Sequence, residues 1–255
     1  MKEVKITEKA RQVIRRLFSR NSVTVLKTDP ELTELYDNFA FDKLLEHTTE
    51  LSEAERCVVQ LVSTLGSKGN HQFQTMVNVC LNVGVKPREI REIVYQAFPY
   101  IGFSKMLDFI LFLNDQFENN NIKLPLDDQG TTTEENRTEK GRQVLEEAFG
   151  KEVIEEMKAN IPAGQEHIYE FITNYSFGGF YTRTGLTIQQ RELNTFCLLS
   201  SMGGAQKLMD LHARANKHVG NSKAKMVAAV TAMIPYIGFP RTLLALDAIN
   251  GAYDE

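Results

Sequence analysis

Glu192 and His212 are the two side chains whose types could support chemistry together. Glu192 lies in an otherwise apolar stretch, and His212 follows across a small-residue break. A carboxylate in an apolar helix is costly to bury without a partner, and an imidazole can supply one. Such a pair can act as general acid and base, because desolvation raises a carboxyl pKa towards neutrality, where histidine titrates. The residues alone also allow a solvated Glu192 that offsets a helix macrodipole and a surface His212.

Thiols offer a second kind of chemistry, from Cys57, Cys80 and Cys197. None belongs to a CxxC pair, and all three fit apolar positions of helices, where free cysteine is commonly buried. A reactive thiol needs exposure and a lowered pKa, and the sequence indicates neither for Cys57.

The histidines form no HxxxH or HExxH pattern, and GxGxxG and GxxxxGK[ST] are missing from the sequence. We therefore predict no metal and no nucleotide cofactor.

Composition narrows the class of protein. The 255 residues carry 29 Lys and Arg against 33 Asp and Glu, for a net charge of −4, which argues against nucleic-acid binding through bulk positive charge. Hydrophobic residues make up 42%, enough for a real core. The charged N-terminus does not resemble a signal peptide, and no apolar run approaches the roughly 18 residues of a membrane helix. We expect a cytoplasmic protein with a small-molecule substrate and no nucleic-acid or membrane partner.

The chain contains a long internal repeat. TEKARQV at 7–13 recurs as TEKGRQV at 138–144, and PYIGF at 99–103 recurs unchanged at 235–239. A repeat of this length indicates gene duplication that produced two similar domains rather than a solenoid. The polar segment 118–136, which contains a proline and a glycine, has the composition of a connector. We place the two domains at residues 1–129 and 130–255.

Within each copy the pattern is helical. Apolar residues recur at three- and four-residue spacing over 58–65 and again over 193–202. Ser52 and Thr187 precede these stretches, each with Glu or Gln three residues on, which is the spacing of a capping box. These two helices are apolar on most faces and are therefore expected at the centre.

Glycines and prolines mark the remaining helices. A second helix in each copy should end at Gly84 or Gly220, where a left-handed cap suits glycine. The expected third and fourth helices run from Pro87 to Pro99 and from Gly102 onwards, and from Ser222 to Pro235 and from Gly238 onwards. VTVLK at 23–27 reads equally as a short strand or as loop. We predict an all-α fold, with each copy a small helical bundle.

The ordered motifs of the second copy resemble the carboxymuconolactone decarboxylase family, which includes the alkylhydroperoxidase D proteins. They are FGGFYTRTGL at 177–186, REL at 191–193, Gly203-Gly204, His212, VGN at 219–221 and PYIGFPR at 235–241. The first copy is similar through NFAF, LSEAER, LNVGV and QAFPYIGF. The resemblance implies two tandem all-helical domains of the alkylhydroperoxidase D type, with an active site in a cleft between helices. It also implies assembly into rings, so a duplicated chain would form a homotrimer with a pseudo-hexameric arrangement.

Residue by residue, the resemblance assigns the catalytic positions to Glu192 and His212. In the first copy Cys57 and Met76 occupy these positions, so we expect at most one acid/base site per chain. Arg183 is a candidate to grip a substrate carboxylate, because guanidinium binds carboxylate through two parallel hydrogen bonds. The reaction implied is cofactor-free decarboxylation of a small carboxylated lactone or related acid.

Two alternatives remain open at this point. The first is a peroxiredoxin-like antioxidant using Cys57 alone, since Ala205 and Leu208 stand where the alkylhydroperoxidase branch has its CxxC. The second is a ring-forming binding protein without catalysis. Tyr100 and Tyr236 of the repeated PYIGF are interpreted as packing residues, because they also occur in the copy that lacks the Glu and His.

Overall fold

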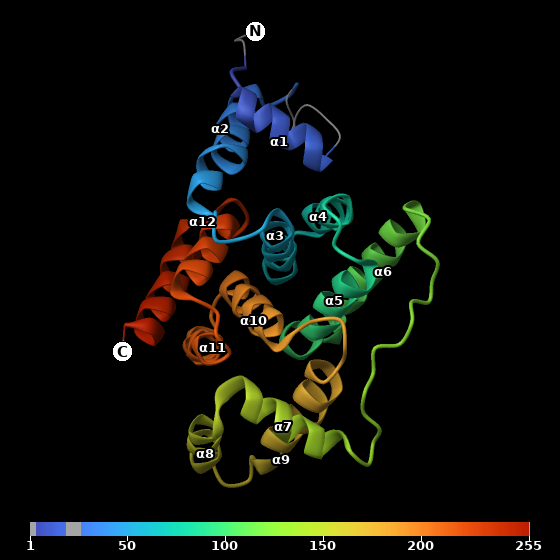
Figure 1. The fold of residues 1–255 in the computed structure, drawn as a ribbon, viewed down its shortest axis with the longest axis vertical. Coiled ribbons are helices and arrows are strands. Elements are labelled where there is room, and N and C mark those ends of the chain that lie inside the picture. Colours follow the sequence, from blue (N-terminus) through green and yellow to red (C-terminus); the bar gives the residue numbers. More distant parts are fainter. Residues whose placement is uncertain (1–3, 19–26, 255) are drawn as a thin grey trace.

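A computed structural model describes residues 4–18 and 27–254, and this part of the chain is built from helices joined by loops (Figure 1). None of the described residues lies in a strand. Residues 23–26 of the ambiguous segment VTVLK fall outside the described residues, and Lys27 lies in a turn. The predicted all-α class is confirmed.

The first copy supplies the N-terminal half of the helices. They are α1 (Glu8–Phe18), α2 (Pro30–Phe41), the short 3-10 helix η1 (Lys43–His47), α3 (Glu53–Ser67), α4 (Asn70–Asn82), α5 (Pro87–Ile101) and α6 (Phe103–Asn119). Ser52 and Glu55 form the predicted capping box at the start of α3. Gly84 takes a φ of 86° just after α4, in the left-handed region expected there.

The second copy has a similar series of helices. Its helices are α7 (Arg137–Phe149), α8 (Lys151–Ala159), α9 (Glu166–Phe171), the π-helix η2 (Ile172–Tyr181), α10 (Ile188–Met202), α11 (Gln206–His218) and α12 (Lys223–Tyr253). Thr187 and Gln190 form the second capping box. Gly238 breaks α12 into two helices with a φ of 74°, where a fourth helix was expected to begin. Pro235 does not end its helix, and neither does Pro99 of α5.

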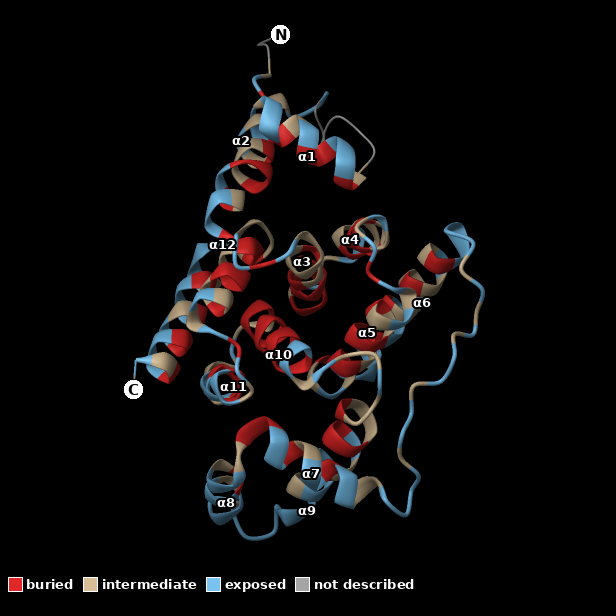
Figure 2. Cartoon of the chain, in the orientation of Figure 1, coloured by how far each residue is buried: buried red, intermediate tan, exposed pale blue. Residues whose placement is uncertain are grey.

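The two copies share one hydrophobic core. Buried residues of α3, α4 and α5 belong to the same cluster as those of α10, α11 and α12. Figure 2 shows α10 buried along most of its length in the middle of the molecule. The repeat therefore produces interlocked halves rather than two separately packed bodies. The boundary at residue 130 stays a prediction, and this residue lies in a connector without helix.

The two halves approach each other very closely at Gly66 of α3. A Cβ added there would lie 2.6 Å from the carbonyl oxygen of Leu198 and 2.6 Å from the Cβ of Ser201, both on α10. Such distances are well inside van der Waals contact, so only glycine permits this spacing. The central helices of the two copies are thus held together at their C-terminal halves.

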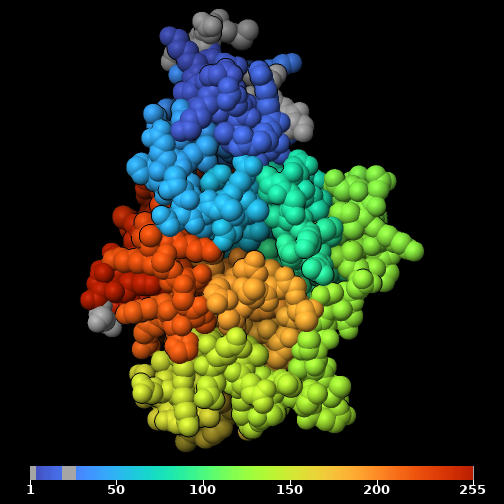
Figure 3. All heavy atoms as spheres, in the orientation of Figure 1, coloured from blue at the N-terminus to red at the C-terminus, as the bar shows by residue number. Residues whose placement is uncertain are grey.

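A smaller layer lies at one end of the elongated molecule (Figure 3). It consists of α7, α8, α9 and η2, and it has a small core of its own that includes Phe149, Phe177 and Tyr181. Gly141 of α7 and Gly178 of η2 bring these two helices so close that an added Cβ on either would collide with backbone of the other. This contact positions the C-terminal end of η2 beside α10.

One helix in the described part, α12, is long and apolar enough in composition to cross a membrane. It is broken at Gly238, however, and Met226, Val230 and Met233 are buried in the shared core. These residues show that the first part of α12 packs in the core of the protein.

Replacement of Gly66 with alanine tests the inter-copy contact. The added methyl group has no room, so we expect Gly66→Ala to lower the free energy of unfolding by about 2 kcal/mol, measured by urea denaturation. Gly251→Ala is the matched control, because it lies on an exposed helical turn and its added methyl group would have no atom within 4 Å. The control should be neutral or stabilising by up to about 1 kcal/mol. Equal stability of the two variants would contradict the tight packing of α3 on α10.

Candidate active site

Glu192 and His212 are in direct contact. Glu192 lies in the first turns of α10 and His212 in the middle of α11, and His212 Nδ1 lies 2.7 Å from Glu192 Oε2. Glu192 is 0% exposed and His212 is 3% exposed. The solvated, surface interpretation of these residues is therefore wrong. Burial without bulk water strengthens the interaction between the carboxylate and the imidazole.

Asn216 fixes the two helices at this point. Its Nδ2 donates to the backbone carbonyl oxygens of Glu192 at 2.9 Å and of His212 at 2.8 Å. Its Oδ1 accepts from Asn221 Nδ2 at 2.8 Å, and that amide also donates to the carbonyl oxygen of Gln189 at 3.0 Å. The VGN motif thus has a physical role, because Asn221 and Asn216 tie α11 to the start of α10.

The second oxygen of the Glu192 carboxylate has no partner. Oε1 is buried and receives no hydrogen bond within the described part of the chain. A buried acceptor without a donor costs about 1–3 kcal/mol. Glu192 therefore has one oxygen committed to His212 and another available to a proton or to a donor on a bound molecule.

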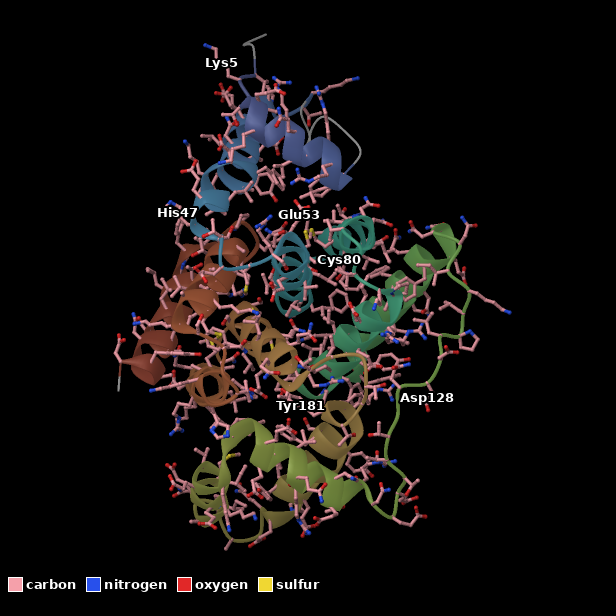
Figure 4. All side chains as sticks on the ribbon, in the orientation of Figure 1. Lys5, His47, Glu53, Cys80, Asp128 and Tyr181 are labelled. Atoms are coloured by element: carbon pink, nitrogen blue, oxygen red, sulfur yellow. The ribbon has the colours of Figure 1, made fainter. Side chains whose placement is uncertain are left out.

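Aromatic side chains surround the imidazole. The rings of Tyr100 and Phe149 meet His212 edge to face, with centroid distances of 6.0 and 5.3 Å. The hydroxyl of Tyr100 lies 3.2 Å from that of Tyr181, which lies 2.5 Å from Thr195 Oγ1. Figure 4 shows Tyr181 between the smaller layer and α10. Burial, followed by the nearby charge of Glu192, raises the pKa of both Tyr100 and Tyr181 above the ordinary value.

The site combines residues of both copies. Tyr100 comes from α5 of the first copy, whereas Glu192 and His212 come from the second. An equivalent contact runs from the second copy to the first. Met76 occupies the position of His212 in the first copy, and the hydroxyl of Tyr236, the equivalent of Tyr100, donates to its sulfur at 3.5 Å. The interpretation of Tyr100 as a packing residue stays a prediction, but the argument for it assumed that each copy completes its own site.

The equivalent position in the first copy has no acid/base pair. Cys57 and Met76 are both buried there. A cavity of about 300 Å³ lies next to this position, bordered by Tyr36, Gln72 and Tyr236 among others. Burial raises the pKa of the Cys57 thiol to about 12. A buried, protonated thiol is a poor nucleophile, so the geometry disfavours the single-cysteine peroxidase.

Arg183 is already paired with a carboxylate of the protein, and its role as a clamp for a substrate carboxylate stays a prediction. Its Nε donates to both oxygens of Glu92, at 3.1 and 2.9 Å, and one terminal nitrogen also donates to Glu92 at 3.0 Å. That nitrogen lies 3.5 Å from Asp128 of the connector, which is labelled in Figure 4. The carboxylate expected from a substrate is supplied by the protein itself. The pairing was not foreseen because Glu92, like Tyr100, reaches the second copy from α5.

A further set of polar residues escaped the sequence analysis. Arg191, almost fully buried, donates from Nη1 to Gln96 Oε1 at 3.1 Å and from Nη2 to the carbonyl oxygen of Arg183 at 2.6 Å. Gln96 Nε2 donates to Thr195 Oγ1 at 2.7 Å. The network thus continues through Thr195 to the two tyrosine hydroxyls beside His212. The polar Gln96 in the apolar face of 90–101 was the available signal, but its partner could not be identified from one sequence.

Comparison with known proteins identifies the class. The model of the carboxymuconolactone decarboxylase family matches residues 30–115 and again residues 166–250. The chain belongs to this family, as a member with two copies of its domain. Among the described residues, no group of three His, Cys, Asp or Glu side chains is placed to hold a metal ion.

A solved structure shares the fold along nearly the whole chain. It is a crystal structure from Burkholderia xenovorans LB400 that bears the provisional name of a gamma-carboxymuconolactone decarboxylase subunit. The TM-score is 0.56 at 16% sequence identity, and the match covers 95% of this chain and 96% of the other. A search of curated proteins found no match. The likeness supports the fold, while the chemistry must be argued from the site.

Thiol labelling tests the state of Cys57. At pH 8 a thiol with a pKa of about 12 is ionised in roughly one molecule in ten thousand, and Cys57 is buried, so iodoacetamide should leave the native chain unlabelled. Denatured protein should take up one label per cysteine, by mass spectrometry. Ser104→Cys, at an exposed position, serves as a control that should label rapidly in the native state. Rapid native labelling of Cys57 would restore the thiol hypothesis.

Proposed function

We propose that this protein is a carboxy-lyase that decarboxylates a small carboxylated lactone, or a related acid, without a cofactor. The observation that carries the proposal is the buried contact between Glu192 and His212, in which Glu192 Oε1 has no partner. Family membership supports a decarboxylase-like enzyme at a coarse level. The particular reaction rests on the residues of the site.

The reaction needs one proton and one place for an electron pair. The bond between the substrate carbon and its carboxylate breaks, carbon dioxide leaves, and the electron pair delocalises onto the lactone carbonyl as an enolate. The carbon then takes a proton from the Glu192–His212 pair, which is reprotonated from solvent. The balance is one carboxylate and one proton consumed for one carbon dioxide released, so no redox partner is required.

The two tyrosines have a role in this proposal. Because the pKa of Tyr100 and of Tyr181 is raised, both hydroxyls remain protonated at neutral pH and can donate a hydrogen bond. A donor held in place before the reaction stabilises negative charge as it develops on an enolate oxygen. The aromatic surroundings of His212 exclude water and strengthen this interaction.

Substrate entry requires a local opening, since the catalytic pair is shielded. Phe149 covers His212 from the smaller layer, which has a limited core of its own. We propose that displacement of this ring admits the substrate. Segments with few buried apolar contacts open at low free-energy cost. Helix α8, which follows Phe149, has one buried residue, and α9 of the same layer has none.

We also propose that the chain assembles as a homotrimer with six domain copies in a ring. Exposed large apolar side chains occur at equivalent positions of the two copies, a pattern typical of a surface that both copies bury in the same way. These pairs are Leu32 and Ile168, Leu35 and Phe171, Phe103 and Phe239, and Leu107 and Leu243.

We propose that the protein is cytoplasmic, since the three cysteines are free.

Glu192→Gln tests the proposed chemistry. The amide keeps the shape of the carboxylate but cannot exchange a proton, so turnover should fall at least about 100-fold, measured as carbon dioxide release from gamma-carboxymuconolactone. Circular dichroism and Tm establish that the variant is folded. Glu152→Gln, on the exposed side of α8, is the matched control and should retain full activity. Undiminished turnover by Glu192→Gln would refute the assignment.

The proposed assembly is tested by charge on the duplicated apolar positions. Leu107→Glu combined with Leu243→Glu places a charge on the same face of both copies, and burying it would be costly. We expect light scattering to give a trimer mass for the wild type and a monomer mass for the double variant. Leu208→Glu is an exposed control whose counterpart in the first copy is Gln72, so it should leave the mass unchanged. A monomer mass for the wild type would refute the proposed homotrimer.

A further inference from the structure

A second cavity lies between the two copies, away from the Glu192–His212 pair. It has a volume of about 370 Å³ and is formed where the first turns of α3 and α10 meet the starts of α5 and α12. Neither Glu192 nor His212 lines it. While Gly66 holds the C-terminal halves of α3 and α10 together, their N-terminal halves border this space. The size is within the range of cavities that bind small molecules.

Equivalent residues of the two copies face each other across the cavity. Val58 and Leu193 occupy equivalent positions and are apolar on both sides. The next pair has diverged, since the first copy has Val59 and the second has Asn194. A third pair differs in charge, with Glu89 in the first copy and Lys225 in the second. The cavity therefore lies at the junction of the repeat, but its walls are no longer alike.

Asn194 is a buried polar residue that lines this cavity. It is 5% exposed, it lines the cavity, and none of the hydrogen bonds in the described part of the chain reaches its side-chain amide. Its equivalent in the first copy is an apolar valine, so packing alone does not require an amide here. Its amide atoms are not fully buried, so they are open to the cavity, where a bound molecule can supply their hydrogen bonds.

The charges in the cavity leave one carboxylate unneutralised. Lys225 Nζ lies 2.5 Å from Glu55 Oε1, so this cation already has a partner. Glu89 makes a long contact of 3.4 Å to the backbone nitrogen of Lys86, and it takes part in none of the ion pairs among the described residues. The cavity therefore offers a negative charge and an amide oxygen above an apolar wall.

We propose that this cavity binds a small amphipathic amine. The ammonium group pairs with the carboxylate of Glu89 and donates to Asn194 Oδ1, while the apolar body packs among Val58, Ile93 and Leu193. The ligand chemistry is opposite in charge to the carboxylated substrate of the proposed function. The two proposals can therefore fail independently of each other.

Three compounds of similar size and different charge test the ligand class. We would titrate the full chain at pH 7 with 2-phenylethylamine, 2-phenylethanol and 3-phenylpropanoate by isothermal calorimetry. We expect saturable binding of one amine per chain, with the alcohol about tenfold weaker because it lacks the charged hydrogen bond, and the carboxylate no tighter than the alcohol. Tightest binding by the carboxylate, or no saturable binding of the amine, would overturn the proposal.

Two variants locate the binding. Asn194→Val introduces the residue of the first copy and should weaken the binding of the amine about tenfold, because the acceptor for the ammonium group is lost. Glu89→Gln should weaken the binding of the amine about tenfold, so that the amine no longer binds more tightly than the alcohol. Asn250→Val, at an exposed position outside the cavity, should bind as the wild type does. Amine affinity within twofold of the wild type in both cavity variants would overturn the assignment.

Discussion

The contact between α3 and α10 at Gly66 determines how the rest of the molecule is arranged. Because the two central helices approach closely there, the following helices of each copy are brought against the central helix of the other. One result is that α5 delivers Tyr100 to His212 and Glu92 to Arg183. Another is the space left between the N-terminal halves of the same helices. The contact of Tyr100 with His212 and the second cavity therefore both depend on how α3 packs on α10.

The two copies contribute unequally to the candidate site. The first copy has neither a carboxylate nor an imidazole at positions 57 and 76, yet its α5 contributes Tyr100 to the candidate site of the second copy. Tyr236 makes the equivalent contact with Met76, although there is no acid/base pair beside it. Each half thus supports the fold of the other, and chemistry needs to be kept in only one.

The sequence allowed prediction of those features that depend on neighbours along the chain. The capping boxes at Ser52 and Thr187 and the break at Gly238 follow from local backbone chemistry and were predicted correctly. The pairing of Glu192 with His212 was expected from the resemblance to the family. The contacts of Tyr100 and Arg183 were not, because their partners lie more than 80 residues away across the copies. A single sequence gives no measure of such distant packing.

Two buried side-chain atoms without a hydrogen-bond partner lie next to each other in the first two turns of α10. They are Arg191 Nε and Glu192 Oε1. The equivalent residues of α3 are Arg56 and Cys57, neither of which has a buried polar atom left without a partner. Each unsatisfied group costs about 1–3 kcal/mol, and a helix buried on nearly every side within a shared core can tolerate that cost. Since folds commonly accept local destabilisation at sites where molecules bind, the asymmetry between these two helices supports the proposal that the active site lies on α10.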